Sequence, residues 1–595
     1  MCTRSAVASA VLAFLLIPPA LAAKAPSGGP PQGGQSAAEP KRAAPAAKTP
    51  PDKKAAPEAK APSEKKAAPA LQPPETQAPD AKAPEPPPQP KTPAEALRAD
   101  LDRIFAETAS AKATVAVRII ALADPPAAPP AAPPEVLYAA RADMPLVPAS
   151  TMKLVVTAAC FDRFGPDWRL RTHVGRIPSA GQDAKWDLAV IGGGDPNFSG
   201  RFWGGDIVGA FRRWADVLKA RGITAVGRVV LDDSLFDDAL QHPRWPADQR
   251  AEWYEAPVSA LVLNDSCIDV HVLASKAGEP ALVTVEPPGS GAAVDGIIQT
   301  VAERAQHSYS IERIVAAGPG ASMRLRVAGR FWSGAAEAME YRTVASPTMF
   351  FGSVLAEALR AEGITVAGPV ARERLTQAGG LARPDFECDV IHASRLDVTA
   401  GVANKRSQGL YAECLMKLLG AYGPAARAQY GPVRAGEAAA PAAAPAAGAV
   451  LPPRQGTWAN GAEEARLWLS ERGIPLGGCV IDDGSGLSKE NRLTALAVTE
   501  LLRVMRERHG DSFLQTLAAA GQEGSLAKRL RGTAAEGRVW GKTGYVLGTS
   551  ALSGYVCAKS GRMIIFSILM NDVPWGELWK ARLAQDRVCL RLVEY

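Results

Sequence analysis

Residues 154–161 would be apolar on every face of a helix, and only a helix buried on all sides can satisfy that pattern. The apolar positions are Leu154, Val155, Val156, Ala158, Ala159 and Phe161. Pro148 lies near the start of this run, and Gly165-Pro166 would end it. The sequence therefore predicts a central helix around which other elements must pack.

Ser150 and Lys153 stand at the beginning of this predicted helix. Side chains three positions apart share a helix face, so the Lys153 amine can reach the Ser150 hydroxyl and, when neutral, accept its proton. A Ser-x-x-Lys pair is therefore an activated nucleophile. The spacing alone is weak evidence, because Ser63 to Lys66 and Ser525 to Lys528 share it.

The N-terminus has the pattern of a secretory signal peptide from Met1 to Ala22. Arg4 precedes an apolar stretch from Ala6 to Ile17, and Ala20-Leu21-Ala22 supplies small residues for cleavage. The stretch is too short to span a bilayer comfortably. We therefore expect a periplasmic or otherwise extracytoplasmic protein.

Residues 23–92 consist of Ala, Pro, Lys and Glu with almost no large apolar side chain. Such a segment cannot bury enough surface to offset the entropy lost on ordering, so it is predicted to be a disordered tether. Its lysines contribute to the formal net charge of +6 and would favour peripheral association with an anionic cell wall or membrane surface. A solvated spacer is the simpler alternative. A second Ala/Pro tract, residues 435–453, is predicted to be a surface insertion.

The cysteines and histidines are dispersed. Seven cysteines remain after signal cleavage without Cys-x-x-Cys spacing, so buried free thiols are favoured over zinc sites or a disulfide framework. The six histidines form no pair at helical spacing, which disfavours a Ser-His-Asp mechanism.

A chain of 595 residues exceeds what one hydrophobic core supports, so several domains are expected. The region from His173 to about Pro384 has short strand patterns punctuated by glycine. Both flanks combine helix and strand patterns: helices at 96–105, 493–505 and 578–592, and strands at 114–122, 136–140, 539–544, 552–556 and 563–570. We expect one discontinuous α+β domain, residues 93–175 and 386–595, that encloses a mainly β insertion, residues 176–385.

Lys542-Thr543-Gly544 lies on one of the C-terminal strands. It supplies a fixed cation, a hydroxyl and a position without a side chain, so an extended substrate with a carboxylate could approach closely. Alone the triplet is weak, because an edge-strand lysine explains it equally well.

The order of these features is more informative. Ser150-x-x-Lys153, Ser407 at the head of a helix and Lys542-Thr543-Gly544 resemble the three motifs of the D-alanyl-D-alanine carboxypeptidases and endopeptidases, low-molecular-mass penicillin-binding proteins with an insertion between the first two motifs. Further segments resemble the same family: Gly192 to Pro196, Val229 to Phe236, Tyr254 to Leu261, Asn404 to Ser407, Asp483 to Ser488 and Leu552 to Tyr555.

This resemblance implies a penicillin-binding, serine β-lactamase-like fold, with an antiparallel sheet flanked by helices. It implies acyl transfer in which Ser150 is the nucleophile, Lys153 the general base and Ser407 a proton relay. Lys542 and Thr543 would hold the substrate carboxylate, and Gly544 would let the substrate approach closely. The backbone N–H groups of Ser150 and Tyr545 would form the oxyanion hole. Peptidoglycan stem peptides would be substrates and β-lactams inhibitors, with no metal, organic cofactor or nucleic acid involved.

Two positions depart from the family pattern. The second motif is Ser407-Gln408-Gly409, where the family has Ser-x-Asn, and Tyr545 follows the glycine of the third motif, where threonine is usual. Losing one transition-state contact costs about 2.7–4 kcal/mol, roughly a hundred- to thousandfold in rate, so slow but measurable turnover is expected. The alternatives are a catalytically weak peptidoglycan-binding module and a serine β-lactamase, and the large insertion disfavours the latter.

Removal of the tether provides a first test. A protein that begins at Thr92 should keep the melting temperature and the penicillin acylation rate of the full chain, because the tether has no apolar surface to pack. Differential scanning calorimetry and labelling kinetics measure both quantities. A loss of several degrees would show that the tether packs on the domain.

Overall fold

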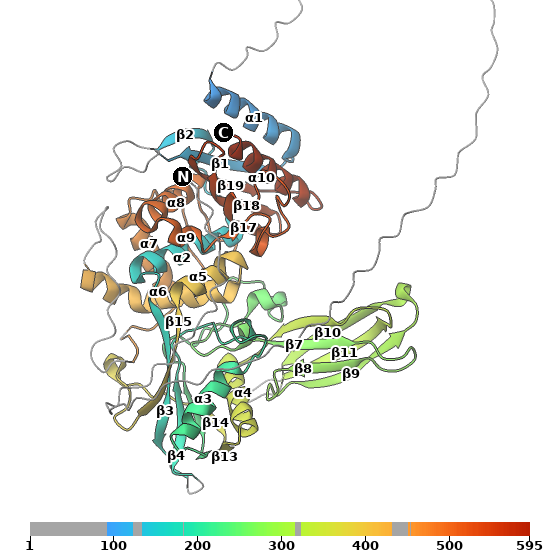
Figure 1. Ribbon diagram of the computed structural model, residues 1–595, viewed down its shortest axis with the longest axis vertical. Coiled ribbons are helices and arrows are strands. Elements are labelled where there is room, and N and C mark those ends of the chain that lie inside the picture. The colour runs from blue at the N-terminus through green and yellow to red at the C-terminus, as the bar shows by residue number, and fades with distance from the viewer. Residues whose placement is uncertain (1–91, 123–133, 182–183, 316–322, 431–449, 453) are drawn as a thin grey trace, which may run out of the picture. The chain divides into compact units, whose positions relative to one another are not determined.

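The computed structural model describes residues 92–122, 134–181, 184–315, 323–430, 450–452 and 454–595 (Figure 1). The predicted signal peptide, the tether up to residue 91 and most of the 435–453 tract lie outside these residues. Within the described ranges, every helix is too short or too polar to cross a membrane.

The two flanks of the chain build one antiparallel sheet, which contains the five predicted strands and a short sixth, Ala518–Ala519 (Figure 1). Thr114 of the first strand lies opposite Asn571, and Ala121 lies opposite Ile564, so strands from the beginning and the end of the domain pair in the middle of the sheet. In spatial order the strands are β16 (Ala518–Ala519), β17 (Val539–Val546), β18 (Thr549–Cys557), β19 (Met563–Asn571), β1 (Thr114–Ala121) and β2 (Glu135–Ala140).

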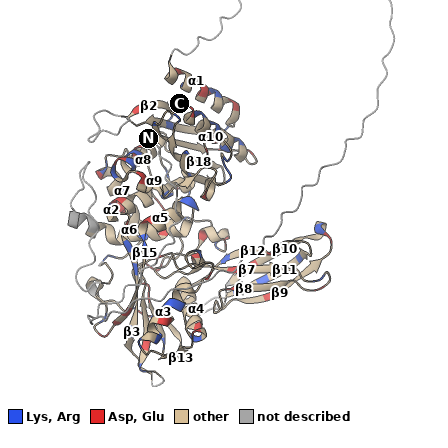
Figure 2. Ribbon diagram, in the orientation of Figure 1, with Lys and Arg blue, Asp and Glu red and all other residues tan. Residues whose placement is uncertain are grey.

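Both faces of this sheet are covered by helices. Along β1, Val117 and Ile119 pack in the core beneath α1 (Pro93–Thr108) and α10 (Leu578–Val593), whereas Ile120 joins the core of the remaining helices. This alternation is the period-two pattern of a strand buried on both sides. Figure 2 shows charges of both signs along the elements, and Arg591 of α10 pairs with Asp100 of α1 at 2.8 Å.

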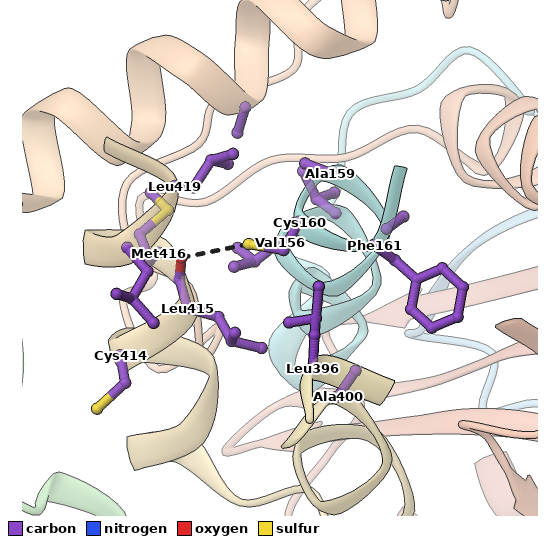
Figure 3. Packing of buried hydrophobic residues seen from close by; sticks show 14 of the residues in the cluster. Val156, Ala159, Cys160, Phe161, Leu396, Ala400, Cys414, Leu415, Met416 and Leu419 are labelled. Atoms are coloured by element: carbon purple, nitrogen blue, oxygen red, sulfur yellow. Dashed lines mark hydrogen bonds between the residues drawn. The ribbon is translucent and has the colours of Figure 1, made fainter. Parts of the chain in front are cut away.

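The predicted central helix is present as α2 (Lys153–Phe164), and each of its residues is buried. It is preceded by one turn of 3-10 helix, η1 (Ala149–Met152), and ends at Gly165 with φ 83°. Figure 3 shows Val156, Ala159 and Cys160 among side chains of the neighbouring helices, and the Cys160 thiol donates to the Leu415 carbonyl oxygen at 3.4 Å. The surrounding helices are α5 (Leu396–Lys405), α6 (Gly409–Tyr430), α7 (Trp458–Glu471), α8 (Ala495–His509) and α9 (Asp511–Leu514).

Six of the seven cysteines are free thiols, as the sequence analysis expected: Cys160, Cys267, Cys388, Cys414, Cys479 and Cys589. The prediction is wrong for Cys557, which is disulfide-bonded. Burial raises the pKa of the Cys160 thiol far above its ordinary value. The free cysteines therefore act as small hydrophobic residues.

The insertion begins with a mixed five-stranded sheet. Its strands are β3 (Arg169–Pro178), β4 (Trp186–Ile191), β6 (Val229–Asp232), β14 (Val370–Arg372) and β15 (Glu387–Arg395), accompanied by α3 (Gly209–Ala220), α4 (Pro347–Ala361), β5 (Ala225–Val226) and β13 (Thr365–Val366). Because β3 pairs with β15, this sheet includes residues on both sides of the limits at 175 and 386. Those limits stay a prediction, and the pairing favours limits near 168 and 396.

Two three-stranded sheets complete the insertion (Figure 1). One consists of β12 (Ala338–Thr343), β7 (Cys267–Leu273) and β8 (Leu282–Glu286), and the other of β10 (Ser308–Val315), β11 (Met323–Trp332) and β9 (Ala293–Val301). The insertion is thus mainly β.

Candidate active site

The structure brings Ser150 and Lys153 into contact at the junction of η1 and α2. The Lys153 Nζ atom lies 3.0 Å from Ser150 Oγ, so the spacing seen in the sequence becomes a hydrogen bond. Ala149, directly before the serine, has φ 48°, a left-handed conformation that non-glycine residues rarely adopt. Such strained positions cluster at functional sites, where surrounding packing holds them.

Lys153 is only 2% exposed, and its burial lowers the pKa of the amine to about 8. The negative charges of Glu413 and Asp483 partly oppose this shift. A lysine with an ordinary pKa is almost entirely protonated at neutral pH. With a pKa of about 8, the neutral form of Lys153 is present in a much larger fraction of molecules. Lys153 therefore meets the electrostatic requirement for a base.

Ser407 and Lys542 form a second pair. Lys542 Nζ donates to Ser407 Oγ at 2.8 Å and to the Thr543 carbonyl oxygen at 2.7 Å. Burial, followed by the charge of Lys153, holds the pKa of Lys542 well below its ordinary value. Ser407 has φ 58° in the short link between α5 and α6, so its position depends on the surrounding packing.

The edge of β17 provides the third part of the site. Strand β16 pairs with β17 only at Trp540 and Gly541, so within the described residues the edge from Lys542 onward lacks a strand partner beside η1. A Cβ atom on Gly544 would lie 2.6 Å from the Pro148 carbonyl oxygen, which explains why glycine is needed here. An extended substrate can therefore lie along this edge.

Tyr545 lies at the outer end of the same strand. Its side chain is 51% exposed, and the Arg582 guanidinium lies 5.9 Å from the centroid of its ring. The structure thus pairs Ser150 with Lys153 and Ser407 with Lys542, and the charge of Lys153 acts on Lys542. Thr543, Gly544 and Tyr545 follow Lys542 along the strand edge.

The second motif lacks the family's asparagine, and the Ser485 carbonyl contacts Lys153 in this structure. The Gln408 side chain donates to the Asp265 carboxylate of the insertion, so it does not replace the missing asparagine. Instead, Lys153 Nζ donates to the Ser485 carbonyl oxygen at 2.6 Å. The lysine therefore keeps a second hydrogen-bond acceptor although residue 409 is glycine.

The segment that presents this carbonyl is held by two buried carboxylates: Asp483, which begins the family-like segment 483–488, and Glu413, which the sequence analysis did not single out. Asp483 accepts hydrogen bonds from the Gly486 and Ser488 N–H groups, both at 2.7 Å. Glu413 accepts from the Gly484 and Ser485 N–H groups. A signal was available: Glu413 is an acidic residue inside the apolar stretch 410–419, where a charge needs partners.

No group of three or more His, Cys, Asp or Glu side chains suited to a metal ion occurs among the residues described. A cavity of about 1010 Å³ is lined by His242, Arg244 and Trp458, among others. Ser150 and Lys542 are not among its lining residues, so this cavity is not the site described above.

Comparisons with known proteins agree with this geometry. The profile of the family described as "D-Ala-D-Ala carboxypeptidase 3 (S13) family" matches residues 101–432 and 446–588. A D-alanyl-D-alanine carboxypeptidase of Actinomadura sp. (strain R39) is 31% identical over 518 residues, which cover 84% of this chain and 85% of the relative. Penicillin binding protein 4 (dacB) of Haemophilus influenzae has the same fold, with a TM-score of 0.63 and 18% identity over 83% of this chain and 99% of that one.

The shifted pKa of Lys153 predicts how stability depends on pH. Because the folded protein loses this proton near pH 8 and the unfolded chain near 10.5, the unfolded chain binds more protons between these values. The free energy of unfolding should therefore rise with pH across that window, by on the order of 3 kcal/mol.

Denaturant unfolding of the wild type and of Lys153→Met at pH 7.5 and pH 10.5 measures the effect. The variant lacks the titrating amine, so its stability should rise less over the same interval. Equal rises in the two proteins would contradict a lowered pKa at Lys153.

Proposed function

Because the chain belongs to the D-Ala-D-Ala carboxypeptidase 3 (S13) family, we propose that it cleaves D-Ala-D-Ala peptide bonds through an acyl-enzyme on Ser150. Ser150 Oγ forms a bond to the carbonyl carbon, the peptide C–N bond breaks, and the terminal D-alanine leaves with a proton on its amine. Water then hydrolyses the ester and restores the serine. The observation that carries this proposal is the 3.0 Å contact between Lys153 Nζ and Ser150 Oγ in a buried site.

The contacts suggest a role for each neighbouring residue. Lys153 accepts the serine proton, and Ser407, bound to Lys542, passes a proton to the leaving amine. Lys542 and Thr543 bind the terminal carboxylate at the edge of β17. The backbone N–H groups of Ser150 and Tyr545 stabilise the oxyanion, a role that does not depend on the exposed Tyr545 side chain.

Peptidoglycan stem peptides are the substrates in this proposal, and β-lactams acylate the same serine. The Haemophilus influenzae protein of the same fold has been solved with a bound β-lactam, which supports the second part. A binding module without turnover is the alternative, and Gly409 was the reason to consider it. The contact between Lys153 and the Ser485 carbonyl favours an active enzyme instead.

We place the protein outside the cytoplasm, after cleavage of the signal peptide that residues 1–22 resemble. The Lys-containing tether would then hold the enzyme near the anionic wall or membrane surface. Mass spectrometry of the mature N-terminus in fractionated cells tests the location. Release of the tether-free protein by washing that retains the full chain tests the association.

Replacement of the nucleophile is the direct test of the mechanism. Ser150→Ala should abolish covalent labelling by fluorescent penicillin and hydrolysis of a D-Ala-D-Ala peptide, while the protein stays folded by circular dichroism. Ser525→Ala is the matched control, because it has the same Ser-x-x-Lys spacing and should retain labelling. Persistent labelling of folded Ser150→Ala would refute the assignment. Rapid loss of the label from the wild type would indicate a β-lactamase.

Substitutions of Gly409, the third residue of the second motif, should change the acylation rate according to the side chain they add. A Cβ atom on Gly409 would lie 3.6 Å from the Ser485 Cβ atom and 3.3 Å from the Tyr254 carbonyl oxygen, so asparagine fits with a small adjustment. Because Ser485 already binds Lys153, Gly409→Asn should restore only a substrate contact, about 1 kcal/mol or roughly fivefold faster acylation. Gly409→Ala, which adds the Cβ without the amide, should not accelerate the reaction. Slower acylation by the asparagine variant would show that the site has another solution.

A further inference from the structure

Glu413 is a buried carboxylate that is connected to Lys153, the proposed general base, through the backbone of Ser485. It lies in the first turns of α6 and is 0% exposed. Its Oε1 atom accepts from the Ser485 N–H at 2.7 Å, and its Oε2 atom accepts from the Gly484 N–H at 2.9 Å and from the Trp458 indole N–H at 2.8 Å. One carboxylate therefore accepts hydrogen bonds from two successive peptide groups of the 483–488 segment.

The next peptide group of the segment leads to the reacting atoms. It carries the Ser485 carbonyl, and its own N–H, that of Gly486, donates to the Asp483 carboxylate at 2.7 Å. The Ser485 carbonyl oxygen accepts a hydrogen bond from Lys153 Nζ at 2.6 Å, and the same nitrogen lies 3.0 Å from Ser150 Oγ. A neutral amine has two N–H bonds and one lone pair. When one N–H is committed to the Ser485 carbonyl, rotation of the amine is restricted and the lone pair can be aimed at the serine.

We propose that Glu413 is a positioning residue, which sets the Ser485 carbonyl so that the Lys153 lone pair faces the Ser150 hydroxyl. The inference rests on the proposed function and adds to it a residue that touches no substrate. In the step concerned, the Ser150 O–H bond breaks, the proton forms a bond with the Lys153 lone pair, and the oxygen electron pair attacks the carbonyl carbon.

Glu413 would lower the stability of the fold if its only role were structural. A carboxylate in a helix core loses its hydration, and an apolar side chain of similar size would fill the space at lower cost. Burial and the neighbouring Asp483 charge raise the pKa of Glu413 to about 7. The Asp483 charge acts on Glu413, and the Glu413 charge acts on Lys153 in the site and on Lys417, which pairs with Asp237 outside it.

Glu413→Gln tests the proposal with little change in shape. The amide can no longer accept hydrogen bonds through both of its terminal atoms, so one backbone N–H loses its acceptor and the carbonyl shifts. Acylation by a β-lactam should slow roughly ten- to hundredfold. The pKa of Lys153, followed by the ¹³Cε resonance of its side chain, should fall, because the negative charge that raises it has been removed.

Glu464→Gln is the matched control. Glu464 is an equally buried carboxylate on α7, paired with Arg454 at 3.4 Å. Its variant should lower the melting temperature without changing the acylation rate or the Lys153 pKa. Trp458→Phe keeps an aromatic ring but removes one donor to Glu413, and it should slow acylation less than Glu413→Gln does. If Glu413→Gln does not fold, the acylation rate of Trp458→Phe tests the positioning role in its place.

The outcomes separate the two proposals. If the wild type is acylated at Ser150 and Glu413→Gln behaves like Glu464→Gln in rate and Lys153 pKa, the positioning role is wrong and the proposed function stands. If the wild type is not acylated, the proposed function fails. The positioning role rests on that function and fails with it. When the wild type is acylated, the acylation rate decides, because removal of the Glu413 charge lowers the Lys153 pKa by itself and an unchanged rate overturns the positioning role even when the pKa falls.

Discussion

The site depends on one lysine amine that is kept out of water and pointed at one hydroxyl. Burial alone would leave Lys153 neutral but free to rotate, and hydrogen bonds alone would leave it protonated. The structure meets both needs by bringing two separate segments to its nitrogen: the turn with Ser150 and the carbonyl of Ser485. A shift in either of these segments changes the basicity or the direction of the lysine.

The insertion contributes to this arrangement as well as separating the motifs in the chain. Asp265 binds the Gln408 side chain, and Arg201 bonds both Asp265, at 2.8 Å, and the Tyr411 hydroxyl, at 3.1 Å. Asn264, Asp265 and Ser266 all have positive φ, from 49° to 58°, an uncommon run for non-glycine residues. The second motif is thus tied to the insertion by its middle residue, which explains why glutamine is accommodated next to Ser407.

Much of this architecture was predictable because its signals are local. The apolar residues of α2, its end at Gly165 and the short apolar strands near the C-terminus can each be recognised within a dozen residues. The motif order, compared with a known family, located the reacting side chains. The partners of the supporting residues were not predictable. Lys153 and Ser485 are 332 positions apart, and nothing local indicates that Glu413 grips the 483–488 segment. The limits of the insertion were uncertain for the same reason, since β3 and β15 pair across more than two hundred residues.

The pairing of β1 with β19 also constrains the order of folding. Until residue 571 has been synthesised, β1 can pair only with β2, and both faces of that hairpin lack most of their cover. Native contacts of such long range form slowly. Apolar strands whose pairing partner has not yet been added to the sheet are prone to aggregation. The early part of the chain must therefore remain unassembled while several hundred residues follow. The serine that this part carries has no complete site around it until the last strands arrive.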